Sequence, residues 1–326
     1  MAIHCNIIRG DQVESDHRVY VVVVNSGKAV VYQSGDPDYL TCVRSSLKPF
    51  QSAASVKTGA VAAAGFSAAE LALMCASHNG ETIHVETARS MLKKLGLKAQ
   101  DYECGCHLPY DQETRRAIVA GELELTPFHN NCSGKHAGML CLAKHLNVDP
   151  KGYVNRDHPV QQKIMETIKF YSGLDKLNLA IDGCSAPTPF LPLFTIAELF
   201  QQLASGDDPV LDQIYSAMVS NPYLVAGRQR FDTAFITALK GRAVSKVGGE
   251  GVRGIGIRTL EGETLGIAVK VIDGHKRAVD PVTVALLEHL GLLNEVENSD
   301  LETYREPLLK NHRQIIVGKI KVQIED

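Results

Sequence analysis

The sequence of 326 residues has no tryptophan, only 6% aromatic residues and no excess of positive charge. Its formal net charge is −3 at pH 7, and Lys and Arg are scattered, so nothing provides a basic surface for nucleic acid or an anionic membrane. No stretch approaches the about 18 apolar residues of a membrane span, and the start MAIHCNIIRGDQ lacks the features of a signal peptide. We therefore expect a cytoplasmic protein with a small neutral partner, and no nucleic acid or membrane partner.

The chain has 44% hydrophobic and 22% charged residues, enough to bury a large core. Strand-forming residues dominate both ends, and helical patterns fill the middle. We therefore predict an α+β fold in which both chain ends share one antiparallel sheet flanked by helices, with a mostly helical central lobe. The prediction is a single domain over 1–326, with a sheet lobe of about 1–45 plus 240–326 and a helical lobe of 46–239.

Turn and helix signals locate the main elements. The β-rich stretches 17–35 and 251–274 are interrupted by the turn sequences NSG and EG, which predicts two hairpins. Helices are predicted over 47–59, 67–76 and 83–97. The sequence SHNGE at 77–81 is then a loop between two helices.

Eight cysteines make an even number, but pairing is not the default expectation in a reducing compartment. Buried thiols and metal ligands are the two alternatives. The cysteines are Cys5, Cys42, Cys75, Cys104, Cys106, Cys132, Cys141 and Cys184.

Ser45 and Lys48 have the spacing that places an amine beside a hydroxyl on one helix face, where the amine can act as its base. The spacing alone is weak, since Ser90 and Lys93 share it and a solvated helix surface explains either pair. Context separates the two. Pro49 must fall in the first turn of its helix, which places Ser45 at the helix start, where free N–H groups favour developing negative charge.

Two further motifs follow in the order found in penicillin-recognising serine enzymes: S-x-x-K, a serine loop, then a lysine on a strand. Ser77 opens the loop S-H-N, and Lys246 opens K-V-G ahead of the second hairpin. A literal K-T-G at 57–59 belongs to the helix of Lys48, so we prefer Lys246. A lysine is a base at neutral pH only when burial or another cation lowers its pKa, so both lysines should be enclosed.

Two cysteine motifs are foreign to penicillin enzymes, and with the serine motifs they make the chain resemble the rhizobial-type L-asparaginases. The motifs are RSSLKPFQ, CASHNGE, NNCSGKHAGML, IDGCSAPTPF and KVGGEG. The resemblance implies a serine β-lactamase-like fold, hydrolysis of L-asparagine to L-aspartate and ammonia, a homodimer, and a zinc ion beside the catalytic serines.

The resemblance also assigns residues. The catalytic pairs would be Ser45 with Lys48 and Ser77 with Lys246. The zinc ligands would be Cys132, Lys135, Asp182 and Cys184. Arg44 and His136 would flank the substrate.

Several questions stay open at this point. Ser45 is the first choice of nucleophile because of its helix-start position, while Ser77 either relays protons or attacks. From spacing alone, Cys132 and Cys184 would be buried hydrophobes rather than ligands; the resemblance reverses this, and zinc could orient the substrate without being essential. The cluster at 104–107 looks like a metal loop, and we interpret it as structural.

Other functions compete with this one. A glutaminase of the same fold would differ by one methylene in its substrate, which a pocket discriminates by only about 1–3 kcal/mol. A penicillin-type enzyme is disfavoured by the extra cysteine motifs. A non-catalytic zinc-binding module would use the serines only as helix caps.

Overall fold

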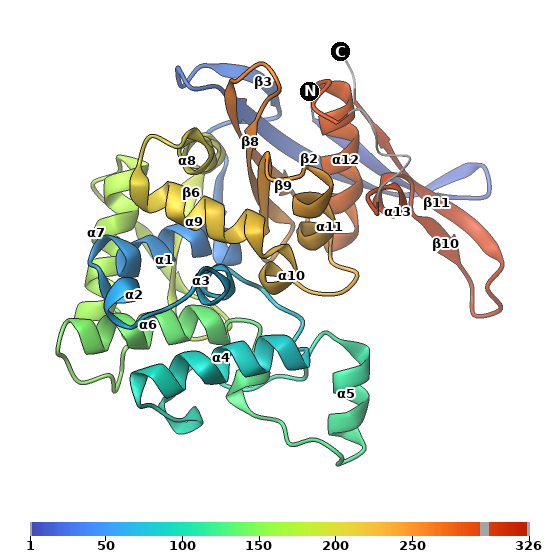
Figure 1. The fold of residues 1–326 in the computed structure, drawn as a ribbon. Helices are drawn as coiled ribbons and strands as arrows, with labels where there is room; N and C mark the ends of the chain where they lie inside the picture. The colour runs from blue at the N-terminus through green and yellow to red at the C-terminus, as the bar shows by residue number, and fades with distance from the viewer. Residues whose placement is uncertain (1, 294–299, 325–326) are drawn as a thin grey trace. The chain divides into compact units, whose positions relative to one another are not determined.

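The computed structural model describes residues 2–293 and 300–324 (Figure 1). These residues form two compact units, which we call the sheet unit and the helical unit. The sheet unit comprises Met1–Ser46, Leu191–Ser205 and Ala234–Asp326. The helical unit comprises Leu47–Phe190 and Gly206–Thr233.

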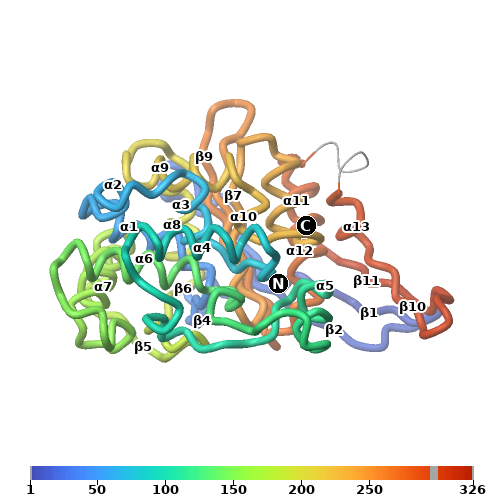
Figure 2. The backbone as a smooth tube through the Cα atoms, turned by 60° about the horizontal axis from the view of Figure 1, so that its bottom comes forward, coloured from blue at the N-terminus to red at the C-terminus, as the bar shows by residue number. Residues whose placement is uncertain are grey.

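An eight-stranded antiparallel sheet is the framework of the sheet unit, in the order β10-β11-β1-β2-β9-β8-β7 with β3 paired to β2. The strands are β1 (Ile3–Arg9), β2 (Gln12–Val24), β3 (Val30–Ser34), β7 (Ala243–Val247), β8 (Val252–Arg258), β9 (Thr264–Val271), β10 (Leu308–Lys310) and β11 (Ile316–Gln323). Strand β1 pairs with β11, with Cys5 opposite Val322, and Figure 2 shows the two side by side. The prediction that both chain ends share one sheet is confirmed.

Both predicted hairpins are also present. Strand β2 returns as β3, with Val21 opposite Ser34. Strand β8 returns as β9, with Ile255 opposite Ile267.

Two helices cover opposite faces of this sheet. They are α8 (Leu193–Ser205) and α12 (Val279–His289). Arg253 of β8 bonds to Asp280 and Thr283 of α12, whereas a Cβ on the next residue, Gly254, would meet the ring of Phe200 in α8. Because successive side chains of a strand point to opposite faces, α12 and α8 lie on opposite sides of the sheet.

The sheet unit also holds β4 (Leu40–Cys42), η4 (Lys276–Ala278) and α13 (Glu302–Arg305). The chain passes from one unit to the other within η1 (Arg44–Leu47) and α11 (Phe231–Ala238). The helix α8 lies in the predicted helical lobe of 46–239, yet it is grouped with the sheet because its apolar side packs on β8, β9 and β2.

The helical unit contains nine helices, among the described residues, and two paired strands. The helices are α1 (Lys48–Lys57), α2 (Ala60–Ala63), α3 (Ala68–Met74), α4 (Thr82–Leu95), α5 (Gln112–Val119), α6 (Ser133–His145), α7 (Pro159–Ser172), α9 (Pro209–Ser220) and α10 (Pro222–Val225). Shorter elements are η2 (Ala99–Asp101), η3 (Pro127–His129), β5 (Asn178–Ile181) and β6 (Pro187–Pro192). Helix α1 packs against α6, α7 and α9, and α4 lies beside α6 (Figures 1 and 2).

Local signals explain where these helices begin and end. Ser67 and Glu70 form a capping box at the start of α3. Gly96 ends α4 with a φ of 67°, a conformation that glycine adopts without steric cost. The three predicted helices and the loop at 77–81 are confirmed, and with the sheet they establish the mixed α+β class.

Helices α3 and α6 pack closely against each other, and this contact positions residues of the candidate site. A Cβ on Gly134 would lie 2.2 Å from the carbonyl oxygen of Leu73, and one on Gly138 would lie 2.5 Å from Cε of Met74. At Gly134 only glycine allows the two backbones to approach this closely, whereas at Gly138 the neighbour is a flexible side chain. The first turn of α6 therefore lies beside the last turn of α3. Throughout 2–293 and 300–324, every helix is too short or too polar to span a bilayer.

Candidate active site

Lys48, the first residue of α1, is fully buried. Its Nζ donates hydrogen bonds to Ser77 Oγ at 3.1 Å, to the carbonyl oxygen of Asn131 at 3.3 Å, and to that of Ala76. An ammonium has three N–H groups, so each has an acceptor. A buried amine is costly unless it is hydrogen bonded in this way. These three acceptors hold the amine beside the Ser77 hydroxyl.

Three elements bring these groups together: the start of α1, the end of α3 and the start of α6. Pro49 lies in the first turn of α1, where its missing N–H costs nothing. Ser55 Oγ donates to the carbonyl oxygen of Gly138 at 3.0 Å, which ties α1 to α6. The α3–α6 contact then places Asn131 and Ala76 around Lys48.

The Ser77 loop is fixed at its backbone. The Ser77 N–H donates to the carbonyl oxygen of Val225 at 3.0 Å, and the Asn79 N–H donates to that of Ala226 at 2.9 Å. The side chain of Arg230 donates to Asn79 Oδ1 at 2.9 Å. The serine is thus held by the segment after α10 as well as by Lys48.

A second polar cluster begins at the N-terminus of α6. Cys132 precedes the helix, Lys135 lies in its first turn, and Cys184 comes from the β5–β6 connection. Lys135 Nζ donates to Cys184 Sγ at 2.9 Å, and the two thiols are hydrogen bonded to each other. The predicted meeting of Cys132, Lys135 and Cys184 therefore occurs.

The charges in this cluster are coupled. The hydrogen bond from Cys132, supported by the charge of Lys135, lowers the pKa of Cys184. The same bond, together with burial, raises the pKa of Cys132. Burial would lower the pKa of Lys135, but the charges of Cys184, Cys132 and Asp182 outweigh it and raise that pKa. Without metal the cluster is thus a thiolate beside an ammonium.

The donor set fits a zinc ion in part. Two sulfur atoms and an amine converge, and thiolates are preferred zinc ligands. Asp182 acts on Lys135 through its charge, while its Oδ1 accepts the N–H of Gly183 at 2.8 Å. Within the part of the chain that the structure describes, no three His, Cys, Asp or Glu side chains are arranged to hold a metal. A lysine must also lose its proton before it binds a metal.

His136 is completely buried beside this cluster. Its Nδ1 is hydrogen bonded to the Tyr153 hydroxyl at 2.7 Å, and the ring also forms a hydrogen bond with the Cys184 side chain. Burial lowers the pKa of His136, which favours a neutral ring.

In the sheet unit, Lys246 is fully buried on β7, opposite Gly254, and its Nζ donates to the carbonyl oxygen of Val247 at 2.8 Å. A Cβ on Gly248 would lie 2.7 Å from the carbonyl oxygen of Val43, so the end of β7 runs against the segment that leads to Ser45. The expectation that Lys48 and Lys246 are both enclosed is confirmed.

Arg44, the residue before Ser45, has a φ of 52°. This left-handed conformation is uncommon for a side chain other than glycine and is typical of functional positions. A Cβ on Gly249 would lie 2.9 Å from the Arg44 guanidinium, so that glycine leaves room for it.

The predicted site residues therefore fall into two groups. Lys48, Ser77, Cys132, Lys135, Asp182, Cys184 and His136 lie in the helical unit, and Arg44, Ser45 and Lys246 lie in the sheet unit. The pairing of Ser77 with Lys246 stays a prediction, and the structure adds a bond from Lys48 to Ser77 that the pairing scheme did not contain.

Sequence reasoning missed several residues around the Ser77 loop. Asn131 supplies a carbonyl to Lys48, and its place beside Cys132 in a quoted motif was the available signal. Glu81, His84 and Tyr223 surround the loop, but only Glu81 lay in a motif. The cluster at 104–107 behaves as structural: Cys104 bonds to backbone carbonyl oxygens and His107 to Asn131.

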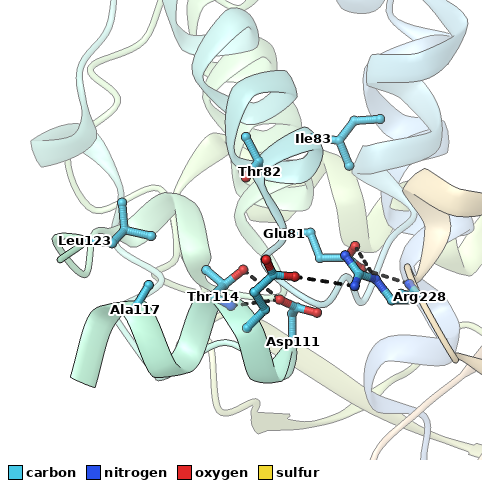
Figure 3. A pocket seen from close by; sticks show the side chains of 9 residues that line it. Glu81, Thr82, Ile83, Asp111, Thr114, Ala117, Leu123 and Arg228 are labelled. Atoms are coloured by element: carbon cyan, nitrogen blue, oxygen red, sulfur yellow. Dashed lines mark hydrogen bonds and ion pairs between the residues drawn. The ribbon is translucent and has the colours of Figure 1, made fainter. Parts of the chain in front are cut away.

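A cavity of about 350 Å³ adjoins this loop on the helical unit (Figure 3). Its polar side includes Glu81, Asp111, Glu113 and Arg228. Arg228 lies between Glu81 and Glu113, and Asp111 caps α5 by accepting from Thr114. The charged groups of the cavity are thus largely paired with one another.

A buried amine bonded to a serine hydroxyl is typical of enzymes that activate a serine for acyl transfer. The fold and site are thus those of a candidate hydrolase. The chain belongs to the L-asparaginase II family, whose match extends over residues 5–322. The resemblance to rhizobial-type asparaginases is confirmed, and the chain is an amidohydrolase, an L-asparaginase.

Two solved structures are similar at low identity. A β-lactamase from Sphaerobacter thermophilus DSM 20745 is 14% identical, with a TM-score of 0.43, over 85% of this chain and 92% of that chain. Mglu in its native form in the presence of 4.3 M NaCl is 15% identical, with a TM-score of 0.45, over 85% of this chain and 62% of that chain. No curated protein sequence matches the chain.

Proposed function

We propose that this L-asparaginase works by serine–lysine nucleophilic catalysis, with Lys48 as the central amine. The observation that carries the proposal is the 3.1 Å hydrogen bond from buried Lys48 Nζ to Ser77 Oγ. Lys48 also follows Ser45 by three residues in the continuous helical segment formed by η1 and α1. This spacing is the one expected of a serine and the lysine that acts as its base.

In the proposed reaction, the neutral form of Lys48 takes the proton of a serine hydroxyl while the oxygen attacks the side-chain amide carbon of asparagine. The amine returns this proton to the departing nitrogen, which leaves as ammonia. Water then attacks the aspartyl ester, a lysine takes its proton, and the serine is released with L-aspartate. Ser45 and Ser77 are the candidate nucleophiles. Whichever of the two does not attack relays the proton, with Lys246 as the second amine.

Substrate orientation is assigned to Arg44 and His136. The place of His136 supports this role, because its buried ring lies beside the Cys184 side chain of the proposed zinc site. Cys132, Lys135 and Cys184, with Asp182, would hold a zinc ion, which supplies positive charge to orient the amino and carboxylate ends of asparagine.

The remaining parts of the proposal concern the assembly and the selectivity. We propose a homodimer in the cytoplasm that prefers asparagine to glutamine. Parallel rates of ammonia release from the two substrates test the preference, and equal rates would assign the chain to both activities.

The decisive experiment measures ammonia release from L-asparagine by the purified protein and by Ser45→Ala and Ser77→Ala. Ser90→Ala is the matched control, because it alters the same serine–lysine spacing on the exposed side of α4. We expect both site variants to lose nearly all turnover and the control to keep it. Mass spectrometry of quenched reactions should find the aspartyl ester on one of the two serines. Full activity in both site variants would contradict the mechanism.

A further inference from the structure

Glu81 is a buried carboxylate at the end of the Ser77 loop, with 6% of its surface exposed. Its Oε1 accepts the Arg228 N–H at 2.9 Å and the Asn79 side-chain amide at 3.1 Å. Its Oε2 accepts the Tyr223 hydroxyl. Hydrogen bonds to an ionised acceptor are about twice as strong as neutral ones. One carboxylate thus fastens the loop to the segment 223–228.

Three rings reinforce this connection. His78, the residue after Ser77, stacks on His84 with centroids 4.9 Å apart and planes 8° apart. His84 stacks in turn on Tyr223, with centroids 5.9 Å apart and planes again 8° apart. His84 Nε2 also donates to the Tyr223 carbonyl oxygen at 3.1 Å. Tyr223 therefore supports the loop through its hydroxyl, its ring and its backbone.

The protonation of His78 follows from its partners. Its Nδ1 accepts the Gly80 N–H at 3.1 Å. Its Nε2 therefore carries the proton and donates to Ser133 Oγ at 2.9 Å. Burial lowers the pKa of His78 well below its usual value, which is consistent with this neutral ring.

The segment 223–228, to which Glu81 fastens the Ser77 loop, has little conformational freedom. Gly227 has a φ of 115°, and a Cβ there would lie 2.4 Å from Glu81 Oε1. Two residues earlier, the backbone carbonyl oxygen of Val225 accepts the Ser77 N–H. A shift of Glu81 or Tyr223 must therefore move the backbone on which Ser77 is mounted. Figure 3 shows Arg228 beside Glu81, and the Arg228 guanidinium pairs with both Glu81 and Glu113.

We propose that Glu81 and Tyr223 are positioning residues that hold the Ser77 hydroxyl in line with Lys48. The inference rests on the proposed role of Ser77, as nucleophile or as proton relay. Neither residue is assigned a contact with substrate. A displacement of about 1 Å at a reacting group can cost about 10²-fold in rate. Removing a hydrogen bond between Glu81 and the segment 223–228 should therefore lower kcat, while KM, which reports substrate contacts, changes little.

The test uses Tyr223→Phe, which keeps the ring stack and removes only the hydroxyl, and Glu81→Gln, which replaces one acceptor oxygen by a donor. The matched control is Tyr171→Phe. Tyr171 also donates its hydroxyl to a carboxylate, Asp208, at 3.2 Å, but on α7. We expect kcat to fall about tenfold in Tyr223→Phe and about 10²-fold in Glu81→Gln, with KM within about twofold and the control unchanged.

A second measurement separates positioning from loss of folding. Denaturant unfolding gives the folded fraction, and the rate at which a fluorophosphonate labels Ser77, followed by peptide mass spectrometry, reports the reactivity of the hydroxyl in the folded protein. Slower labelling in Tyr223→Phe at an unchanged folded fraction supports the proposal. Labelling and kcat equal to those of Tyr171→Phe would overturn it. Ser77→Ala distinguishes the two hypotheses: if that variant stays fully active, the proposed role of Ser77 fails instead.

Discussion

The sheet unit and the helical unit bury charged side chains in different ways. In the sheet unit, fully buried Arg253 faces a carboxylate, with 2.6 Å between its Nη2 and Asp280 Oδ1. In the helical unit, Lys48 donates to a hydroxyl and carbonyl oxygens, and Lys135 donates to a thiol. The charge of Arg253 thus faces a carboxylate and that of Lys135 faces a thiolate, whereas the hydroxyl and carbonyl partners of Lys48 carry no formal negative charge.

This difference separates a buried charge that stabilises the fold from buried amines that are candidates for catalysis. The buried guanidinium joins β8 to α12 and holds the sheet together. The buried amines instead lie where three helices and a loop meet. Lys246 and Lys270 are exceptions in the sheet unit: both are buried amines on strands, and each donates to a backbone carbonyl oxygen. We therefore expect substitution of the buried guanidinium of Arg253 to affect stability, and substitution of the buried amine of Lys48 to affect turnover.

The largest effect is expected from the two buried cations. Lys48→Met removes the proposed base and should lower kcat by about 10³-fold, the range of general-base catalysis. Arg253→Met removes hydrogen bonds to a charged group and should lower the free energy of unfolding by about 2 kcal/mol, while kcat per folded molecule stays unchanged. Ammonia release and urea unfolding measure the two quantities. A Lys48→Met variant that keeps more than about a tenth of the unsubstituted protein's kcat would contradict the role of Lys48 as the base.

Glycines test the same contrast through packing. Gly134→Ala brings a Cβ to 2.2 Å from the Leu73 carbonyl oxygen, so α6 must move away from α3. We expect a loss of about 1–3 kcal/mol in stability and a fall in kcat, because Lys135 moves with the helix. Gly266→Ala brings a Cβ to 1.9 Å from the Ala197 carbonyl oxygen in the sheet unit and should cost stability with kcat unchanged.

Within α6, Gly138→Ala is the control for this experiment. Its Cβ would meet Cε of Met74, the far end of a flexible side chain, which can move aside at lower cost. A loss of stability equal to that of Gly134→Ala would show that backbone approach is not what positions α6.

The sequence predicts much of this organisation, for reasons that differ by element. The hairpins, the capping box at Ser67 and the end of helix α4 at Gly96 are local signals, each encoded by a few neighbouring residues. The meeting of Cys132 with Cys184 could be predicted only because whole motifs were recognisable. Tyr223 and Glu81 are 142 residues apart, and although Glu81 ends the motif CASHNGE, Tyr223 belongs to no motif. Their contact is decided by tertiary packing, which no local period encodes.

A third effect concerns the thiol cluster. Cys184→Ala should lower zinc affinity by at least about tenfold and raise KM more than it lowers kcat, if the metal orients the substrate. The matched control is Cys141→Ala, a buried thiol of α6 whose Sγ bonds to the Ala60 carbonyl oxygen at 3.3 Å. Metal content by mass spectrometry and the two kinetic constants check this. Complete loss of turnover after chelation, with intact folding, would contradict a purely orienting role.

The smallest effect is the pH dependence of stability. Burial lowers the pKa of four histidines of the helical unit from the ordinary value of 6.5: His78, His84, His129 and His136. The unfolded chain binds protons at these sites below pH 6.5 and the folded chain does not. Stability is therefore full above that pH and falls as the pH drops below it.

The sheet unit should respond less near pH 5: among its described histidines, burial and the charge of Arg277 lower the pKa of His275, but that side chain is exposed. Its main response should come at lower pH. Although burial opposes it, hydrogen bonds from His275 and His17 lower the pKa of Asp273 from 3.8, so its contribution is present above that pH and is lost only as the pH falls through the lowered pKa. Hydrogen exchange, corrected for intrinsic rates, should show the helical unit losing protection at about pH 5 while β8 and β9 keep theirs. Equal loss in both would mean that the buried histidines are protonated without cost, which their burial argues against.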